Sequence, residues 1–310
     1  MIKRQFYESL RFILLLWGNS AVALASEVGV LATIKPLQLI VSQITQGISP
    51  ESSALLPPGM TPHDFALKIS DLKRIKQAAL VLWLGPEMEP YLVKIMNDKA
   101  ASQQLNLSTL PAIQHLALRS LAGARHHGRH EDSELDPHIW LSPENGLHIA
   151  NALVEKLSVL DGQNAQLYEQ NLADFKRDLE QLDTFRNAFA KQQVDYIVHH
   201  DAYQYLEARM GLMPTAVVTS EPEVSPGVRH LTELVELIRE RNIHCFVAGP
   251  NLSPRLVSFL FKGQAANGYR VIELDALAGG PVTSYVGFIK DLSSRLSDCI
   301  SGKADGFNPQ

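Results

Sequence analysis

The sequence predicts an α/β protein of two lobes, each a mainly parallel β-sheet flanked by helices, joined by one long rigid helix. Short apolar runs that suit buried strands alternate with amphipathic helical segments along most of the 310 residues. The alternation is interrupted once, by a long helical stretch, and then resumes. Strands that alternate with helices form parallel sheets covered on both faces, which gives the fold class.

The first 25 residues have the anatomy of a secretory signal peptide. Lys3, Arg4 and Arg11 precede the apolar run 12–17, and the small residues up to Ala25 supply a cleavage site. A membrane anchor is the alternative interpretation, but the apolar run is too short to span a bilayer. No cysteine follows the cleavage site, which excludes lipid attachment there. We expect a soluble protein of a periplasm-like compartment.

Residues 26–163 form the predicted N-terminal lobe. Pro36, at a first helical position, predicts a helix through Ile44, and Ser70 is placed to cap a helix over 71–78. The strands expected in this lobe are 28–34, 54–56 and 80–84.

Residues 164–191 form the predicted linker helix. Positions 165–190 contain no glycine or proline, and apolar residues recur there at spacings of three and four. One continuous helix over this stretch would be roughly 39 Å long at 1.5 Å per residue. Such a helix suits a strut between two lobes. A coiled-coil dimer arm is the alternative, although the stretch holds only about three heptads.

Residues 192–310 form the predicted C-terminal lobe. Three Ser-Pro pairs predict helix starts, one in the N-terminal lobe at Ser142-Pro143 and two in the C-terminal lobe at Ser225-Pro226 and Ser253-Pro254. The strands expected in this lobe are 196–199, 216–218, 245–248 and 271–274.

Cysteine content and charge narrow the class further. The two cysteines, Cys245 and Cys299, are expected to form a disulfide in an exported protein, worth about 4 kcal/mol on the loop-entropy estimate. Two free buried thiols are the alternative. The net charge of −5 becomes more negative once the basic signal peptide is removed, so we expect no binding to nucleic acid or to anionic lipid.

Three of the eleven histidines, His63, His138 and His200, occur in turn-like contexts beside the expected strands. In open α/β sheets, ligands bind outside the carboxyl ends of the strands, where these rings would meet. Asp275 follows the strand 271–274 and reaches the same edge. Three imidazoles with one carboxylate or water form a shell typical of zinc. The side chain of His199 should point away from that of His200, into the core.

A polar segment, 124–135, contains His126, His127 and His130 among charged residues. Short histidine-rich tracts often bind metal loosely, so we expect a metal-capture loop there. A solvated linker with incidental histidines is the alternative.

Enzyme motifs are missing from the sequence. It contains no phosphate-binding P-loop, no dinucleotide fingerprint and no G-x-S-x-G elbow. We therefore expect a binding protein and no enzyme. A three-histidine zinc hydrolase with Asp201 or Glu223 as general base is the alternative from another class.

Several motifs in order, from about residue 28 to the end, resemble the zinc-uptake solute-binding proteins of ABC transporters. They are Thr-Ile-Lys-Pro-Leu at 33–37, Leu-Pro-Pro-Gly-Met-Thr-Pro-His-Asp at 56–64, Leu-Trp-Leu-Gly-Pro-Glu-Met-Glu at 82–89, Asp-Pro-His-Ile-Trp-Leu-Ser-Pro at 136–143, His-Asp-Ala-Tyr at 200–203 and Pro-Glu-Val-Ser-Pro-Gly at 222–227. The resemblance implies a high-affinity periplasmic receptor that delivers Zn²⁺ to an inner-membrane permease and its ATPase. We expect it to be a monomer.

The resemblance also assigns the site. His63, His138 and His200 match the family's ligand positions, Asp275 matches a carboxylate ligand of many members, and the cysteine pair matches a disulfide of Gram-negative zinc members. Some zinc members have a glutamate where this chain has Pro62, and many have a longer histidine loop, so the fourth ligand stays open between Asp275 and water. A manganese receptor or a metal-dependent adhesin on the same scaffold is the alternative; a third imidazole at His200, in place of a carboxylate, favours zinc.

Overall fold

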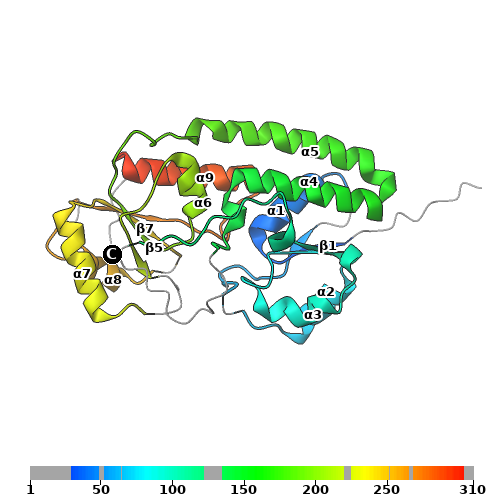
Figure 1. The fold of residues 1–310 in the computed structure, drawn as a ribbon, viewed down its shortest axis with the longest axis horizontal. Coiled ribbons are helices and arrows are strands. Elements are labelled where there is room, and N and C mark those ends of the chain that lie inside the picture. The colour runs from blue at the N-terminus through cyan, green and yellow to red at the C-terminus, as the bar shows by residue number, and fades with distance from the viewer. Residues whose placement is uncertain are drawn as a thin grey trace, which may run out of the picture.

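Two four-stranded parallel sheets organise the molecule (Figure 1). The computed structural model describes residues 29–48, 52–63, 65–121, 135–219, 225–250, 252–264 and 268–303, so the expected signal peptide lies outside the described residues. The N-terminal sheet has the strand order β2-β1-β3-β4 and the C-terminal sheet β6-β5-β7-β8. All neighbouring strands are parallel, which confirms the predicted fold class. The strands are β1 Val30–Ala32, β2 Ser53–Ala54, β3 Leu80–Trp83, β4 Gln104–Asn106, β5 Ile197–His200, β6 Ala216–Thr219, β7 Cys245–Ala248 and β8 Arg270–Glu273.

Strand β4 was not predicted, because two of its three residues are polar. Gln104 bonds through its side-chain amide to the carbonyl oxygens of Met96 and Lys99, both at 2.9 Å. A polar edge strand of this kind gives no apolar run in the sequence.

Each sheet is covered on both faces, as the alternation of strands and helices predicts. In the N-terminal sheet, Val30 and Leu82 belong to a central core, whereas Leu31 and Val81 pack on the opposite face. The helices of the described chain are α1 Lys35–Ile44, α2 Ile69–Gln77, α3 Val93–Asn97, α4 Pro143–Leu160, α5 Ala165–Leu179, α6 Gln204–Met210, α7 Val228–Glu240, α8 Pro254–Leu260 and α9 Tyr285–Ile300.

Capping signals placed some helix starts and misplaced others. Ser142 caps α4 by accepting the N–H of Asn145 at 3.1 Å, and α8 begins at Pro254, as predicted. Helix α7 begins only at Val228, so the start predicted at Ser225-Pro226 is wrong.

Helix α2 also begins away from its predicted cap. It starts at Ile69, before Ser70, because the carboxylate of Asp71 accepts the backbone N–H of Lys68 at 3.0 Å and satisfies the first turn instead. The helix therefore starts two residues earlier than predicted, because Ser70 was taken as the capping residue in place of Asp71.

The long linker helix is shorter than the sequence predicts. Helix α5 ends at Leu179, a 3₁₀ segment continues over Glu180–Phe185, and turns follow to residue 191. The N–H groups of Asn187 and Phe189 donate to the carbonyl oxygens of Arg209 and Met210, both at 2.9 Å, instead of bonding within a helix. Contacts with α6 therefore override the local helical pattern.

The two lobes share one core. Trp140 of the N-terminal lobe and Tyr203 of the C-terminal lobe belong to the same buried cluster. Helix α9 lies beside α5 in Figure 1, and the hydroxyl of Tyr285 at its start lies 2.9 Å from the carbonyl oxygens of Trp140 and Ser142. The molecule is therefore bridged by α5 and by α9.

A disulfide joins α9 to the C-terminal sheet. Cys299 near the end of the helix is bonded to Cys245 at the start of β7, with an S–S distance of 2.06 Å. The predicted pairing is confirmed. In the described part of the chain, helices fall short of the length and apolar content that a membrane crossing requires.

Candidate metal centre

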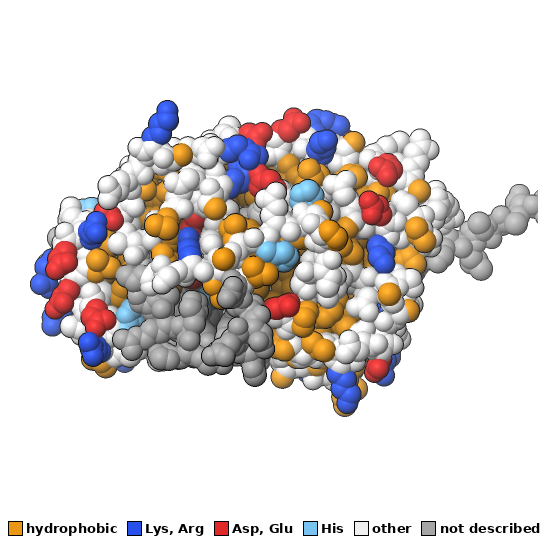
Figure 2. All heavy atoms as spheres, in the orientation of Figure 1, with side chains coloured by type: hydrophobic (Ala, Val, Ile, Leu, Met, Phe, Trp, Pro, Cys, Tyr) orange, Lys and Arg blue, Asp and Glu red, His pale blue; other side chains and the backbone are white. Residues whose placement is uncertain are grey.

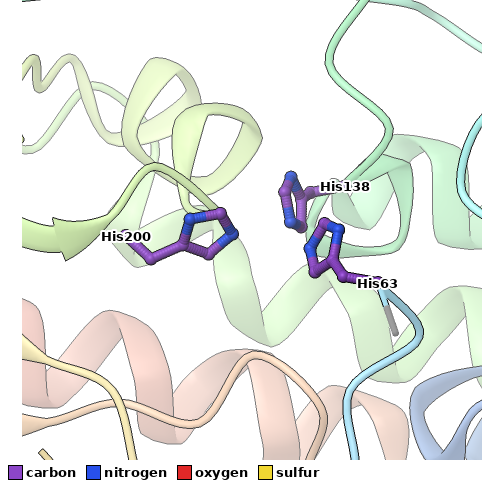
Figure 3. Close-up of side chains that lie close together, drawn as sticks. All are labelled: His63, His138 and His200. Atoms are coloured by element: carbon purple, nitrogen blue, oxygen red, sulfur yellow. The ribbon is translucent and has the colours of Figure 1, made fainter. Parts of the chain in front are cut away.

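His63 lies in the loop that follows β2. Gly59 turns this loop at a φ of +79°, a left-handed conformation that favours glycine. The backbone N–H of His63 donates to Thr61 Oγ1 at 3.2 Å, which closes the turn around the histidine. Figure 3 shows the ring of His63 pointing from this loop toward His138 and His200.

His138 is held by the carboxylate of Asp136. Oδ1 of Asp136 lies 2.9 Å from the backbone N and 2.8 Å from Nδ1 of His138. An ionised carboxylate only accepts hydrogen bonds, so Nδ1 has the proton and the lone pair of Nε2 is left for a metal. Asp136 is 1% exposed and His138 5%, so the pair is fixed in the protein interior.

His200 is the last residue of β5. This strand lies between β6 and β7, where the chain switches from one side of the sheet to the other, the position at which open α/β sheets bind ligands. Its neighbour His199 is half-buried, and burial lowers the pKa of His199 below its ordinary 6.5, which favours a neutral ring.

The three rings meet between the lobes (Figure 3). Their centroids lie 5.8 Å apart for His63 and His138, 5.5 Å for His63 and His200, and 5.3 Å for His138 and His200. One nitrogen from each ring can be chosen so that all three lie within 4.8 Å of one another. Nitrogens of a tetrahedral zinc shell are about 3.4 Å apart, so a zinc ion would draw these atoms together by at most about 1.4 Å.

Asp275 lines the same cleft as the histidines but is not part of the three-nitrogen cluster. Its carboxylate accepts the backbone N–H groups of Leu277 at 2.8 Å and Gly279 at 2.6 Å. These bonds hold the carboxylate at the cleft wall, so its role as a fourth ligand stays a prediction.

The cleft between the lobes has a volume of about 1000 Å³. Its walls include the three histidines, Trp140 and Asp275. Figure 2 shows exposed histidine side chains, in pale blue, near the middle of the molecule and next to hydrophobic side chains. Among the coloured side chains of this face, acidic and basic ones are interspersed, without a continuous basic patch.

Sequence reasoning missed residues that position the site. Trp140 donates from Nε1 to the carbonyl oxygen of Ala276 at 2.7 Å, a bond between the lobes, and its ring centroid lies 5.2 Å from that of His138. Tyr203 donates to the carbonyl oxygen of Leu274, just before Asp275. The Asp-x-His spacing at 136–138 was a signal for the carboxylate that orients His138.

The other histidines fall outside this group. His230 bonds to the carbonyl oxygen of Val218 at 3.0 Å, and His244 to that of Gly268. The predicted capture loop with His126, His127 and His130 lies outside the described residues. Within the described ranges, the three-histidine cluster is the one group of histidine, cysteine or acidic residues with this geometry.

A family model described as "Zinc-uptake complex component A periplasmic" (ZnuA) matches residues 30–299. The chain belongs to the ZnuA family. The match spans both lobes and all three clustered histidines, so the family resemblance deduced from the motifs is confirmed.

Curated relatives extend over nearly the whole chain. The ZnuA zinc-uptake protein of Yersinia pestis is 34% identical over 292 residues, covering 87% of this chain and 91% of the relative. The corresponding protein of Haemophilus ducreyi is 29% identical, covering 90% and 96%.

Solved structures of low sequence identity share the fold. A crystal structure of ZnuA superimposes with a TM-score of 0.73 at 21% identity, covering 88% of this chain and 99% of that chain. The periplasmic zinc-binding protein TroA from Treponema pallidum gives a TM-score of 0.72 at 21% identity, covering 88% and 99%. The two-lobe architecture of the ZnuA family is therefore the architecture of this chain.

Proposed function

We propose that this protein is a periplasmic receptor that captures Zn²⁺ between its two lobes and delivers it to an inner-membrane ABC permease with its ATPase. The observation that supports it is the convergence of three imidazoles donated by both lobes. The family match and the zinc-uptake names of the curated relatives support the same conclusion.

Zinc is the transported cargo, and the ligand set suits it. His63 and His138 are supplied by the N-terminal lobe and His200 by the C-terminal lobe. Neutral imidazole is a strong zinc ligand, and Asp275 or a water completes the shell. The ion adds a further direct link between the lobes, so binding favours one relative arrangement of them.

The bridges between the lobes limit how far they can separate. Helix α9 is anchored in the N-terminal lobe through Tyr285 and in the C-terminal sheet through the disulfide of Cys299. The buried core is continuous across both lobes. Zinc binding therefore needs only a small tilt of one lobe against the other, enough to bring the three histidine nitrogens to zinc-binding distance.

Calorimetry with Zn²⁺ at neutral pH tests the function. We expect binding tighter than micromolar to the wild type, and at least a hundredfold loss in His200→Ala. The matched control is His148→Ala, which removes a half-buried histidine of α4 outside the cluster. Wild-type protein that binds zinc no better than micromolar would refute the proposal.

A manganese receptor is the second candidate. A structural neighbour, the solute-binding protein FpvC of Pseudomonas aeruginosa, was solved in complex with Mn²⁺ and has a TM-score of 0.72 at 19% identity. Three nitrogen ligands favour zinc over the oxygen-preferring manganese. Competition of Mn²⁺ against bound Zn²⁺ distinguishes the two, since zinc should remain bound under a large manganese excess.

The remaining site predictions belong to the same proposal. His126, His127 and His130 would hold additional zinc loosely before transfer, so deletion of 124–134 should remove weak binding and leave the tight site.

Catalysis is not part of the proposal. Of the two candidate bases of the hydrolase alternative, Asp201 is paired with Arg119, and Glu223 lies outside the described residues. We propose that the receptor is a monomer, which sedimentation with and without zinc can test.

A further inference from the structure

A buried ion-pair group joins the two lobes next to the metal centre. Arg119 belongs to the N-terminal lobe, and its Nε lies 3.1 and 3.2 Å from the two carboxylate oxygens of Asp201 in the C-terminal lobe. Its terminal nitrogen bonds to Asp201 and also to Glu207 of α6. The side chains of Arg119, Asp201 and Glu207 are 13%, 14% and 1% exposed, so these pairs are shielded from water.

The ion pairs are fixed to the end of β5. Asp201 directly follows His200, the last residue of this strand. Glu207 accepts a hydrogen bond of 2.8 Å from the hydroxyl of Tyr196, at the other end of the strand. The planar guanidinium of Arg119 donates from two nitrogens to the carboxylate of Asp201 and so fixes the orientation of that carboxylate. The position of His200 is thereby tied to Arg119.

A second set of contacts links the backbone segment just before Arg119 to His138. Ala117 pairs with Leu135, and the N–H of Asp136 donates to the carbonyl oxygen of Leu116 at 2.8 Å. The hydroxyl of Tyr205, on α6, accepts the N–H of Leu116 at 3.0 Å and donates to the carbonyl oxygen of Asp136 at 2.8 Å. Asp136 in turn holds the ring of His138.

These contacts define an interlobe latch, made of Arg119, Asp201, Glu207, Tyr205 and the backbone of 116–117 and 135–136. We propose that Arg119 is a positioning residue for metal binding: the latch fixes His200 relative to His138 before the metal arrives. The inference rests on the proposed metal-binding function and deepens it. A latch that is already closed spares the metal the cost of ordering the two lobes, which raises affinity and slows release.

The test compares wild type, Arg119→Gln, Arg119→Lys and Tyr205→Phe, with Arg177→Gln as control. Arg177 is an exposed arginine of α5 paired with Asp174 at 2.6 Å, on the surface. Zinc affinity is measured by chelator competition, release by stopped flow, and ligand geometry by the visible spectrum of the Co²⁺-loaded protein. Thermal unfolding without metal checks that each variant is folded.

We expect Arg119→Gln to bind zinc 10- to 100-fold more weakly, with faster release and an altered Co²⁺ spectrum. Arg119→Lys keeps the charge but loses the two-bond geometry, so its affinity should lie between those of Arg119→Gln and the wild type. Arg177→Gln should match the wild type in every measurement.

A folded Arg119→Gln with wild-type affinity, release rate and spectrum would overturn the latch. Should that variant fail to fold, Tyr205→Phe decides, because it breaks the second contact without leaving a buried charge unpaired. We expect it to bind several-fold more weakly, and wild-type behaviour would overturn the proposal. Wild-type protein that binds no zinc would refute the receptor function itself, a result distinct from a latch that has no effect.

Discussion

Replacing Asp136 by asparagine tests how the protein prepares His138 for a metal. In the wild type, one carboxylate oxygen of Asp136 accepts from both the backbone and the ring of His138, at 2.9 and 2.8 Å. The other oxygen is buried and has no hydrogen-bond partner among the described residues. Asparagine can keep the first oxygen, but its amide then places an NH₂ group at the buried position of the second oxygen.

The expected loss follows from this geometry. The variant removes a buried carboxylate that accepts a hydrogen bond from the His138 ring and orients it. Substitution of such an outer partner lowers metal affinity about 10- to 100-fold, which is about 1.4 to 2.8 kcal/mol of binding free energy. The loss should be smaller than that of His138→Ala, because the ring itself remains.

Competition with a chromophoric chelator at pH 7.5 measures this effect. The matched control is Asp161→Asn, because Asp161 is also buried and accepts a hydrogen bond of 2.8 Å from Tyr168, at the end of α4 away from the cluster. It should leave zinc affinity unchanged. Equal affinities of wild type and Asp136→Asn would refute the role assigned to this carboxylate.

Three predictions concern stability, each measured by urea unfolding. Burial raises the pKa of Glu89 from 4.5 to about 7, so the contribution of this carboxyl to stability is fully present below pH 4.5 and is lost as the pH rises to 7. Glu89→Gln should match the wild type below pH 4.5 and exceed it by up to about 3 kcal/mol above pH 7, and a pH-independent difference would contradict this. Replacing Cys245 and Cys299 by serine opens a bridge between positions 54 apart and should cost about 4 kcal/mol; equal stability would show that the bridge adds nothing. A Cβ on Gly146 would lie 2.6 Å from the ring of Tyr285, so Gly146→Ala should lower the free energy of unfolding by about 1–3 kcal/mol. A urea midpoint above that of the wild type would mean that the ring moves aside freely.

Local patterns in the sequence predicted most of the fold. Strand β3 and the start of α1 follow from an apolar run and from Pro36, features that span a few residues. Helix α5 follows from its apolar spacing as far as Leu179. The α-helix ends there and a 3₁₀ helix continues to Phe185. From Asn187 the helix prediction was wrong, because backbone N–H groups donate there to carbonyl oxygens of α6, more than twenty residues later.

The sequence by itself determined the two α/β lobes, the histidines to examine and the cysteine pair, since each depends on residue type, on short-range periodicity or on an ordered series of motifs. The tertiary structure alone decided that His63, His138 and His200 face one another, that Asp136 selects the free nitrogen of His138, and that α9 forms a second bridge. The latch around Arg119 is also a feature that only the tertiary structure decided, because the partners of Arg119 are 82 and 88 positions away along the chain. Contacts of that range depend on how two sheets and their connecting helices pack, and no local pattern encodes that packing.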